Sequence, residues 1–264
     1  MTFDLSTTPL VTLENGVLTL PVSLEGKGNA LDSDAVTQMV TALRALVAGE
    51  IDARAVLLVG LGKNFCAGGN VAGFAAADDR SEHIRELADR LHAAVRLLDE
   101  LSVPVVAAVA GWAAGAGLSL ALAADFSVGG SDTRLLAAYP GIGLSPDGGM
   151  SWRLPRVIGQ SAARAFILGN EPMSGDRAYA LGMLTTFVEG DVREAARALA
   201  VRLAAGPSES YAAVKALIRA AEGSDLSAHL DAERDSIARL AVSPDGVEGV
   251  NAFVDKRAPE FGRS

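Results

Sequence analysis

The residues best suited to chemistry lie in a glycine-rich turn that contains Gly111, Gly115 and Gly117. The turn follows the apolar, β-branched run 103–109 and precedes the helix-forming stretch 118–124, so we expect it to join a buried strand to an apolar helix. Such a turn leaves backbone N–H groups unpaired at the start of the helix, where the helix dipole favours an anion or a developing oxyanion. The same pattern also suits a tight packing joint between a strand and a helix, and the turn alone leaves both interpretations open.

Two other stretches contain residues that suit chemistry. A second glycine-rich loop, 60–73, contains the sequence FCAGGN at 65–70, and Asp147 lies in the sequence SPDGG at 145–149. A carboxylate such as that of Asp147 can take a proton from a substrate and return it as a general acid–base group. Pro-Asp-Gly is also an ordinary turn sequence, so turn statistics by themselves favour a structural role for this residue.

The histidines and the cysteine do not indicate a metal site or a nucleophile. His83, His92 and His229 lie on predicted helices, and we interpret them as surface residues or as histidines with satisfied hydrogen bonds. His83 and His92 are nine residues apart, which does not place them on one helix face at metal-ligand spacing. Cys66 is the single cysteine, which excludes an internal disulfide and a cysteine-based metal site and suggests a buried structural thiol.

The composition predicts a soluble, cytoplasmic protein. The 264 residues are half hydrophobic, enough for one large domain, or one domain with a small appendage. The net charge of −9 argues against general binding of nucleic acid or anionic membranes. The N-terminal residues lack the basic and apolar regions of a signal peptide, and no apolar run reaches the roughly 18 residues of a membrane span.

The order of predicted elements indicates an α/β core followed by helices. Asn15-Gly16 predicts a hairpin turn between two short strands, and Asp32 or Ser33 can cap the first helix. Strands then alternate with helices, whereas the stretches 60–80 and 134–152 are predicted to be largely irregular. The last part is predicted as helices over 192–204, 207–221, 226–241 and 246–256. We therefore expect a core over residues 1–200 and a helical region over residues 201–264.

With these segments placed, the chain resembles the crotonase superfamily, the enoyl-CoA hydratase/isomerase family. The resemblance extends over nearly the whole length, and its motifs occur in order and at compatible spacing. They are NALD at 29–32, FCAGGN at 65–70, GWAAGAG at 111–117, IGLSPDGG at 142–149 with LPRVIG at 154–159, and AFVDKR at 252–257. Each glycine-rich piece alone would be weak, but the five segments together are a strong signal.

The resemblance implies a core of repeated ββα units wound into a spiral, with a C-terminal helical region that forms trimers, often paired into hexamers. It implies an acyl-CoA thioester substrate and no cofactor other than the coenzyme A of that substrate. An enolate would be held by two backbone N–H groups, which by position are those of Gly69 and Ala116. The resemblance implies that coenzyme A is bound by Lys27, Ala30, Leu31 and Ala67. It also implies Phe253 and Lys256, because residues at these positions in the family can reach the coenzyme A of a neighbouring subunit. Phe253 and Lys256 are expected to share one helix face.

The acid–base group implied by the resemblance is Asp147. Hydratases of this family use two glutamates, and the corresponding positions here hold Ser119 and Gly141. Family isomerases carry one acidic residue in a segment similar to the one around Asp147, and a single carboxylate suffices to move a proton. The resemblance therefore favours an isomerase acting on a double bond or by ring opening, with Ser119 as a possible auxiliary. The alternatives are a divergent hydratase or acyl-CoA hydrolase that uses Ser119 and an ordered water, and a coenzyme A-binding protein without turnover.

Overall fold

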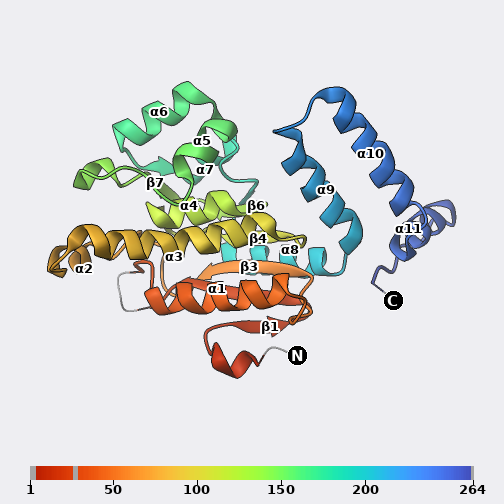
Figure 1. Cartoon of the computed structure of the whole chain (residues 1–264), viewed down its shortest axis with the longest axis horizontal. Coiled ribbons are helices and arrows are strands. Elements are labelled where there is room, and N and C mark those ends of the chain that lie inside the picture. The colour runs from red at the N-terminus through yellow and green to blue at the C-terminus, as the bar shows by residue number, and fades with distance from the viewer. Residues whose placement is uncertain (1–3, 26–28, 263–264) are drawn as a thin grey trace.

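Two sheets form the centre of the molecule (Figure 1). The computed structural model describes residues 4–25 and 29–262. The larger sheet has the order β1-β2-β3-β4-β6-β9, and every pair in it is parallel except the β1–β2 hairpin. Its strands are β1 (Thr12–Glu14), β2 (Val17–Ser23), β3 (Ala55–Gly60), β4 (Val105–Ala108), β6 (Phe126–Gly130) and β9 (Thr186–Val188). The smaller sheet has the order β5-β7-β8, with β5 (Trp112–Ala114), β7 (Arg134–Leu136) and β8 (Met173–Ser174).

The predicted hairpin is confirmed. Asn15 and Gly16 have φ angles of 52° and 72°, the left-handed conformation that a tight two-residue hairpin turn requires, and Glu14 pairs with Val17 across the turn. Every residue of β2 and β3 is buried, as is typical of strands in a parallel sheet that is covered on both faces.

Helices cover both faces of the larger sheet, and the alternating side chains of its strands supply two separate cores. Val56 and Leu58 of β3 pack in a cluster with side chains of α1 (Ser33–Val47) and α3 (Arg80–Glu100). Leu57 and Val59, which point the opposite way, pack with side chains of α8 (Val192–Ala204). The predicted cap of α1 is confirmed, because an Asp32 carboxylate oxygen accepts hydrogen bonds of 3.0 Å from two N–H groups of the first turn.

Some elements near the cavity differ from the sequence prediction. The glycine-rich turn contains the strand β5 before α4 (Ala116–Ala123) begins, and the stretch predicted to be irregular contains the short helix α2 (Val71–Ala76), capped by Asn70. Helix α5 (Met150–Ile158) starts within the region predicted to be loop-rich, directly after two glycines with positive φ. The remaining elements are the 3₁₀ turns η1 (Leu5–Thr7) and η2 (Pro140–Ile142), and helices α6 (Gln160–Gly169) and α7 (Gly175–Ala180).

The last three helices project from the core (Figure 1). They are α9 (Ser208–Ala221), α10 (Leu226–Leu240) and α11 (Pro244–Val254). The expected domain boundary at residue 200 falls within α8, which packs on the sheet, so the projecting part begins at α9. Within the described ranges, no helix combines the length and the apolar character needed to cross a membrane.

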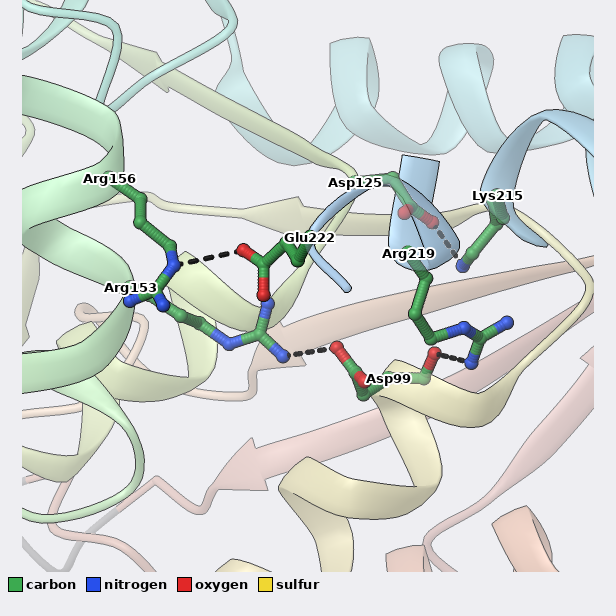
Figure 2. Close-up of polar contacts among 7 residues, drawn as sticks. All are labelled: Asp99, Asp125, Arg153, Arg156, Lys215, Arg219 and Glu222. Atoms are coloured by element: carbon green, nitrogen blue, oxygen red, sulfur yellow. Dashed lines mark hydrogen bonds and ion pairs between the residues drawn. The ribbon is translucent and has the colours of Figure 1, made fainter. Parts of the chain in front are cut away.

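Polar contacts attach α9 to the core (Figure 2). Lys215 Nζ lies 2.6 Å from Asp125 Oδ2, next to the start of β6. Arg219 donates a hydrogen bond of 2.6 Å to the main-chain oxygen of Asp99, at the end of α3, and the Asp99 carboxylate pairs with Arg153 of α5 at 2.6 Å. The projecting helices are therefore connected to the elements that flank the cavity described next.

Candidate active site

A cavity of about 330 Å³ lies among α1, α2, α3, the start of α4 and the loop that precedes α5. Most of its wall is apolar, and Phe74, Leu87 and Leu91 are among the side chains that form it. Asp147 and Tyr139 add polar groups from the loop. An apolar cavity with a few converging polar groups is the usual form of a small-molecule site.

Two backbone segments pair along one side of the cavity. The N–H of Cys66 donates to the oxygen of Trp112 at 3.0 Å, and the N–H of Ala114 donates to the oxygen of Cys66 at 2.9 Å. The pairing leads both segments to the cavity, where Gly69 and Ala116 lie in the wall. Within residues 4–25 and 29–262, neither of these two N–H groups donates a hydrogen bond to the protein.

Glycines allow the close approach of these segments. A Cβ atom on Gly117 would lie 2.4 Å from the main-chain oxygen of Cys66, so no larger residue fits there without a shift of the backbone. Gly115 has a φ of 51° just before α4, a conformation that favours glycine. Ala116 is the first residue of α4, so its N–H lies at the positive end of the helix dipole.

Asp147 is half-buried in the cavity wall, and its position is fixed by its neighbours. Its Oδ1 accepts a hydrogen bond of 2.5 Å from the Tyr139 hydroxyl, and its main-chain oxygen accepts one of 2.8 Å from Ser119 Oγ. Ser119 is fully buried and is not among the described residues that line the cavity. Its hydroxyl therefore contacts the loop of Asp147 rather than the cavity.

Tyr139 and His92 are the two site residues that the sequence did not indicate. Burial raises the pKa of Tyr139 above its ordinary value of 10.0, and the negative charge of Asp147 raises it further. His92 Nε2 accepts a hydrogen bond of 3.2 Å from the N–H of Gly148, so His92 is satisfied, as expected for a helix histidine. The one signal in the sequence that could have indicated Tyr139 is its position directly before Pro140 and eight residues before Asp147.

Cys66 is unsuited to act as a nucleophile. Its side chain is fully buried, and this burial raises the pKa of the thiol to about 12, so it remains protonated near neutral pH. No group of three or more histidine, cysteine or acidic side chains that could hold a metal ion occurs in the described part of the chain.

The expected coenzyme A positions fall in two places. Leu31 and Ala67 line the cavity, and the N–H of Leu31 donates to the oxygen of Gly68 at 2.7 Å, which holds the two loops together. Ala30 is next to this contact but does not line the cavity, and Lys27 lies outside the described residues.

Phe253 and Lys256 lie far from the cavity within one chain. Phe253 is on α11, with 85% of its surface exposed, at the opposite side of the molecule from α2 (Figure 1). The expectation that the two residues share a helix face is wrong, because α11 ends at Val254 and Lys256 has a φ of 55° beyond the helix cap. The chain leaves the helical path before it reaches Lys256.

The comparisons with known proteins agree with this fold and cavity. The sequence profile of the family Enoyl-CoA hydratase/isomerase matches residues 12–264, and the chain belongs to this family. It is 34% identical over 255 residues to the 1,2-epoxyphenylacetyl-CoA isomerase of Escherichia coli strain K12, covering 94% of this chain and 96% of the relative. It is 29% identical over 253 residues to the 2,3-dehydroadipyl-CoA hydratase of the same strain, covering 96% and 97%.

A solved structure extends the likeness to three dimensions. The crystal structure of an enoyl-CoA hydratase from Polaromonas sp. JS666 matches with a TM-score of 0.87 and 35% identity, over 95% of this chain and 98% of that chain. The expected crotonase-type α/β fold with C-terminal helices is thus confirmed. The chain therefore belongs to a family of enzymes, and its relatives are named as acting on acyl-CoA thioesters. Some of these relatives are named isomerases and others are named hydratases.

Proposed function

We propose that the chain is an acyl-CoA isomerase in which Asp147 moves one proton within the substrate. The observation that carries this proposal is the composition of the cavity wall. Among the described residues that line the cavity, Asp147 is the sole carboxylate, and it shares the wall with the two N–H groups of Gly69 and Ala116. One relative's name, 1,2-epoxyphenylacetyl-CoA isomerase, also favours an isomerase and keeps ring opening as a second form of the reaction.

The two N–H groups suit a thioester oxygen that becomes negative during the reaction. A proton on the α-carbon of an acyl-CoA is acidic because its removal leaves an enolate, whose charge rests on that oxygen. Preorganised donors in a site without water stabilise this charge, and the loss of one such donor typically costs about 3 kcal/mol in the transition state. Gly69 and Ala116 supply these donors from the main chain, and their side chains need only be small.

A single carboxylate completes the reaction for a β,γ-unsaturated substrate. The carboxylate takes the α-proton, and the electron pair of that C–H bond enters the enolate. The same group then returns the proton to the γ-carbon, and the double bond moves to the α,β position. Atoms and electrons balance without a further cofactor, so we propose that coenzyme A enters only as part of the substrate, beside Leu31 and Ala67.

Water addition is the second candidate reaction, because one relative is named as a hydratase. It requires a group to activate water and a group to protonate the α-carbon. Ser119 and Gly141 stand where the family's hydratases carry glutamates, and the Ser119 hydroxyl donates to the main chain of Asp147. The cavity therefore supports isomerisation better than the addition or hydrolysis reactions that would use Ser119.

The test offers the enzyme α,β- and β,γ-unsaturated acyl-CoA thioesters and follows the absorbance of the conjugated thioester. We expect conversion of the β,γ substrate, reduced about 10²- to 10⁴-fold in Asp147→Asn. Asp52→Asn, at an exposed position between α1 and β3, is the matched control. Strong water addition by Asp147→Asn would exclude the proposal, and binding of acyl-CoA without any product would indicate a coenzyme A-binding protein instead.

We also propose that α9, α10 and α11 form the contact between subunits of a trimer or hexamer. No residue of α10 is buried within one chain, and Ile218 and Ile237 have 69% and 70% of their surfaces exposed. Apolar side chains this exposed on three adjacent helices are typical of an interface. Sedimentation velocity should show three or six copies, and a monomer at micromolar concentration would contradict the proposal.

A further inference from the structure

Tyr139 and Asp147 lie on either side of the turn η2, and their side chains meet at the cavity. The hydroxyl of Tyr139 donates a hydrogen bond of 2.5 Å to Asp147 Oδ1. Within the described ranges, Oδ2 of Asp147 accepts no hydrogen bond. The two oxygens of one carboxylate therefore have different surroundings.

The main chain around Asp147 is held by two other elements. Ser119 of α4 donates to its main-chain oxygen, and His92 of α3 accepts the N–H of Gly148. Gly148 has a φ of 61°, and a Cβ atom there would lie 2.7 Å from the Cβ of Ser119, so the loop is packed closely against α4. These contacts hold the backbone, whereas the hydrogen bond from Tyr139 holds the Asp147 carboxyl group itself.

We propose, resting on the proposed function, that Tyr139 is a positioning residue that holds Asp147 by Oδ1 and thereby assigns the proton transfer to Oδ2. A carboxylate free to rotate would present either oxygen to the substrate, in many orientations. The hydrogen bond leaves one oxygen with a fixed direction toward the cavity. The rate of proton transfer from one carbon of a substrate to another depends strongly on how the carboxylate oxygen is aligned with both carbons.

The hydroxyl can keep this role over a wide pH range. Burial, followed by the negative charge of Asp147, raises the pKa of Tyr139, so the phenol keeps its proton well above neutral pH. The other titratable groups nearby are on α5, where Arg153 Nε lies 3.9 Å from a Cβ atom built on Gly149, and on α3. His92 contacts the N–H of Gly148, and Arg90, which lines the cavity, lies 3.6 Å from Glu86.

The decisive variant is Tyr139→Phe, which keeps the ring and removes the hydroxyl. We expect kcat for the β,γ substrate to fall about 10- to 100-fold, with KM changed less than about threefold. Tyr179→Phe, at a half-exposed position on α7, removes a hydroxyl away from the cavity and should leave both quantities unchanged.

Two results would overturn the proposal, and they are distinct. Wild-type kcat in Tyr139→Phe, with Asp147→Asn inactive, would overturn the role of Tyr139 alone. Wild-type activity in Asp147→Asn would overturn the proposed function as well, because Tyr139 would then have no base to position.

A second measurement does not depend on how Tyr139→Phe folds. The chain has three tyrosines, whose ionisation can be followed by ultraviolet difference absorbance. We expect one of them to ionise at a higher pH than the others in the wild type, and at a lower pH in Asp147→Asn than in the wild type. Identical titration of the two proteins would show that Tyr139 and Asp147 do not interact, and would overturn the proposal.

Discussion

Ser119 Oγ donates a hydrogen bond of 2.8 Å to the main-chain oxygen of Asp147. This contact joins α4, whose first residue lines the cavity, to the loop that carries the proposed base. The separation between the proposed oxyanion donors and the proposed base thus depends in part on a side chain that does not line the cavity.

Ser119→Ala should weaken both the fold and the reaction, each modestly. The main-chain oxygen of Asp147 loses its shorter hydrogen bond but keeps one of 3.3 Å from the N–H of Met150, so the free energy of unfolding should fall by about 1 kcal/mol. We expect kcat to decrease less than in Asp147→Asn. Urea unfolding and steady-state kinetics measure the two effects, with exposed Ser224→Ala as control. A loss of activity as large as that of Asp147→Asn would mean that Ser119 acts directly in the reaction.

Gly117→Ala should disturb the backbone pairing of Cys66 with Trp112 and Ala114. The new Cβ atom would lie 2.4 Å from the main-chain oxygen of Cys66, so a backbone segment must shift, at a cost of about 1–3 kcal/mol. Activity should fall with stability, because the shift moves the segment that leads to Gly69. Gly169→Ala, where a Cβ atom meets nothing within 4 Å, should leave the melting temperature within a few degrees of the wild type. Equal melting temperatures for both variants would contradict the described packing.

Phe74→Ala should change which acyl groups the enzyme prefers. The Phe74 ring lines the cavity and lies against Gly69, where its Cζ would be 2.7 Å from an added Cβ atom. Removal of the ring enlarges the cavity beside Gly69, where we propose that the thioester binds. The ratio of kcat/KM for bulky over short acyl groups should therefore rise about tenfold. Leu168→Ala, at an exposed position on α6, is the control, and an unchanged ratio in Phe74→Ala would place the acyl group elsewhere.

Lys215→Met should loosen the attachment of α9 to the core. Lys215 Nζ donates to Asp125 at 2.6 Å and to the main-chain oxygen of Val103 at 2.9 Å, and its side chain is largely buried. Loss of these partners should cost about 1–3 kcal/mol in the free energy of unfolding. Arg197→Met, which breaks the exposed ion pair between Arg197 of α8 and Glu14, should cost less than about 1 kcal/mol. Similar losses in the two variants would show that the contacts in Figure 2 contribute no more than surface pairs.

The parts of the fold that the sequence predicted are those with strong local signals. The hairpin at Asn15-Gly16 and the cap at Asp32 depend on residues next to each other in the chain, and helix α8 has the predicted bounds. Strand β5 was missed because it has three residues and is defined by pairing with β7, which no local pattern shows. Helix α2 was missed because its six residues carry no periodic apolar face.

The features of the candidate site also divide into those that the sequence indicated and those that it did not. Gly69 and Ala116 were reached through a resemblance of motifs, and the structure places both in one cavity wall. The contact of His92 with Gly148 joins residues 56 positions apart, and that of Tyr139 with Asp147 depends on the path of the loop between them. Neither contact has a sequence pattern, because each arises only after α3, α4 and the loop have packed together.

The backbone pairing of Cys66 with Trp112 and Ala114 has a consequence for how the enzyme can evolve. In the proposed mechanism the two donors are main-chain N–H groups on these paired segments, so their chemical nature does not depend on side chains, although glycines such as Gly117 allow the segments to approach closely. The proposed proton-transferring group, Asp147, is in contrast one side chain on a separate loop. A new activity can therefore arise by exchange of a single loop residue, and directed evolution of this protein should begin at positions 139–147 and leave the paired segments unchanged.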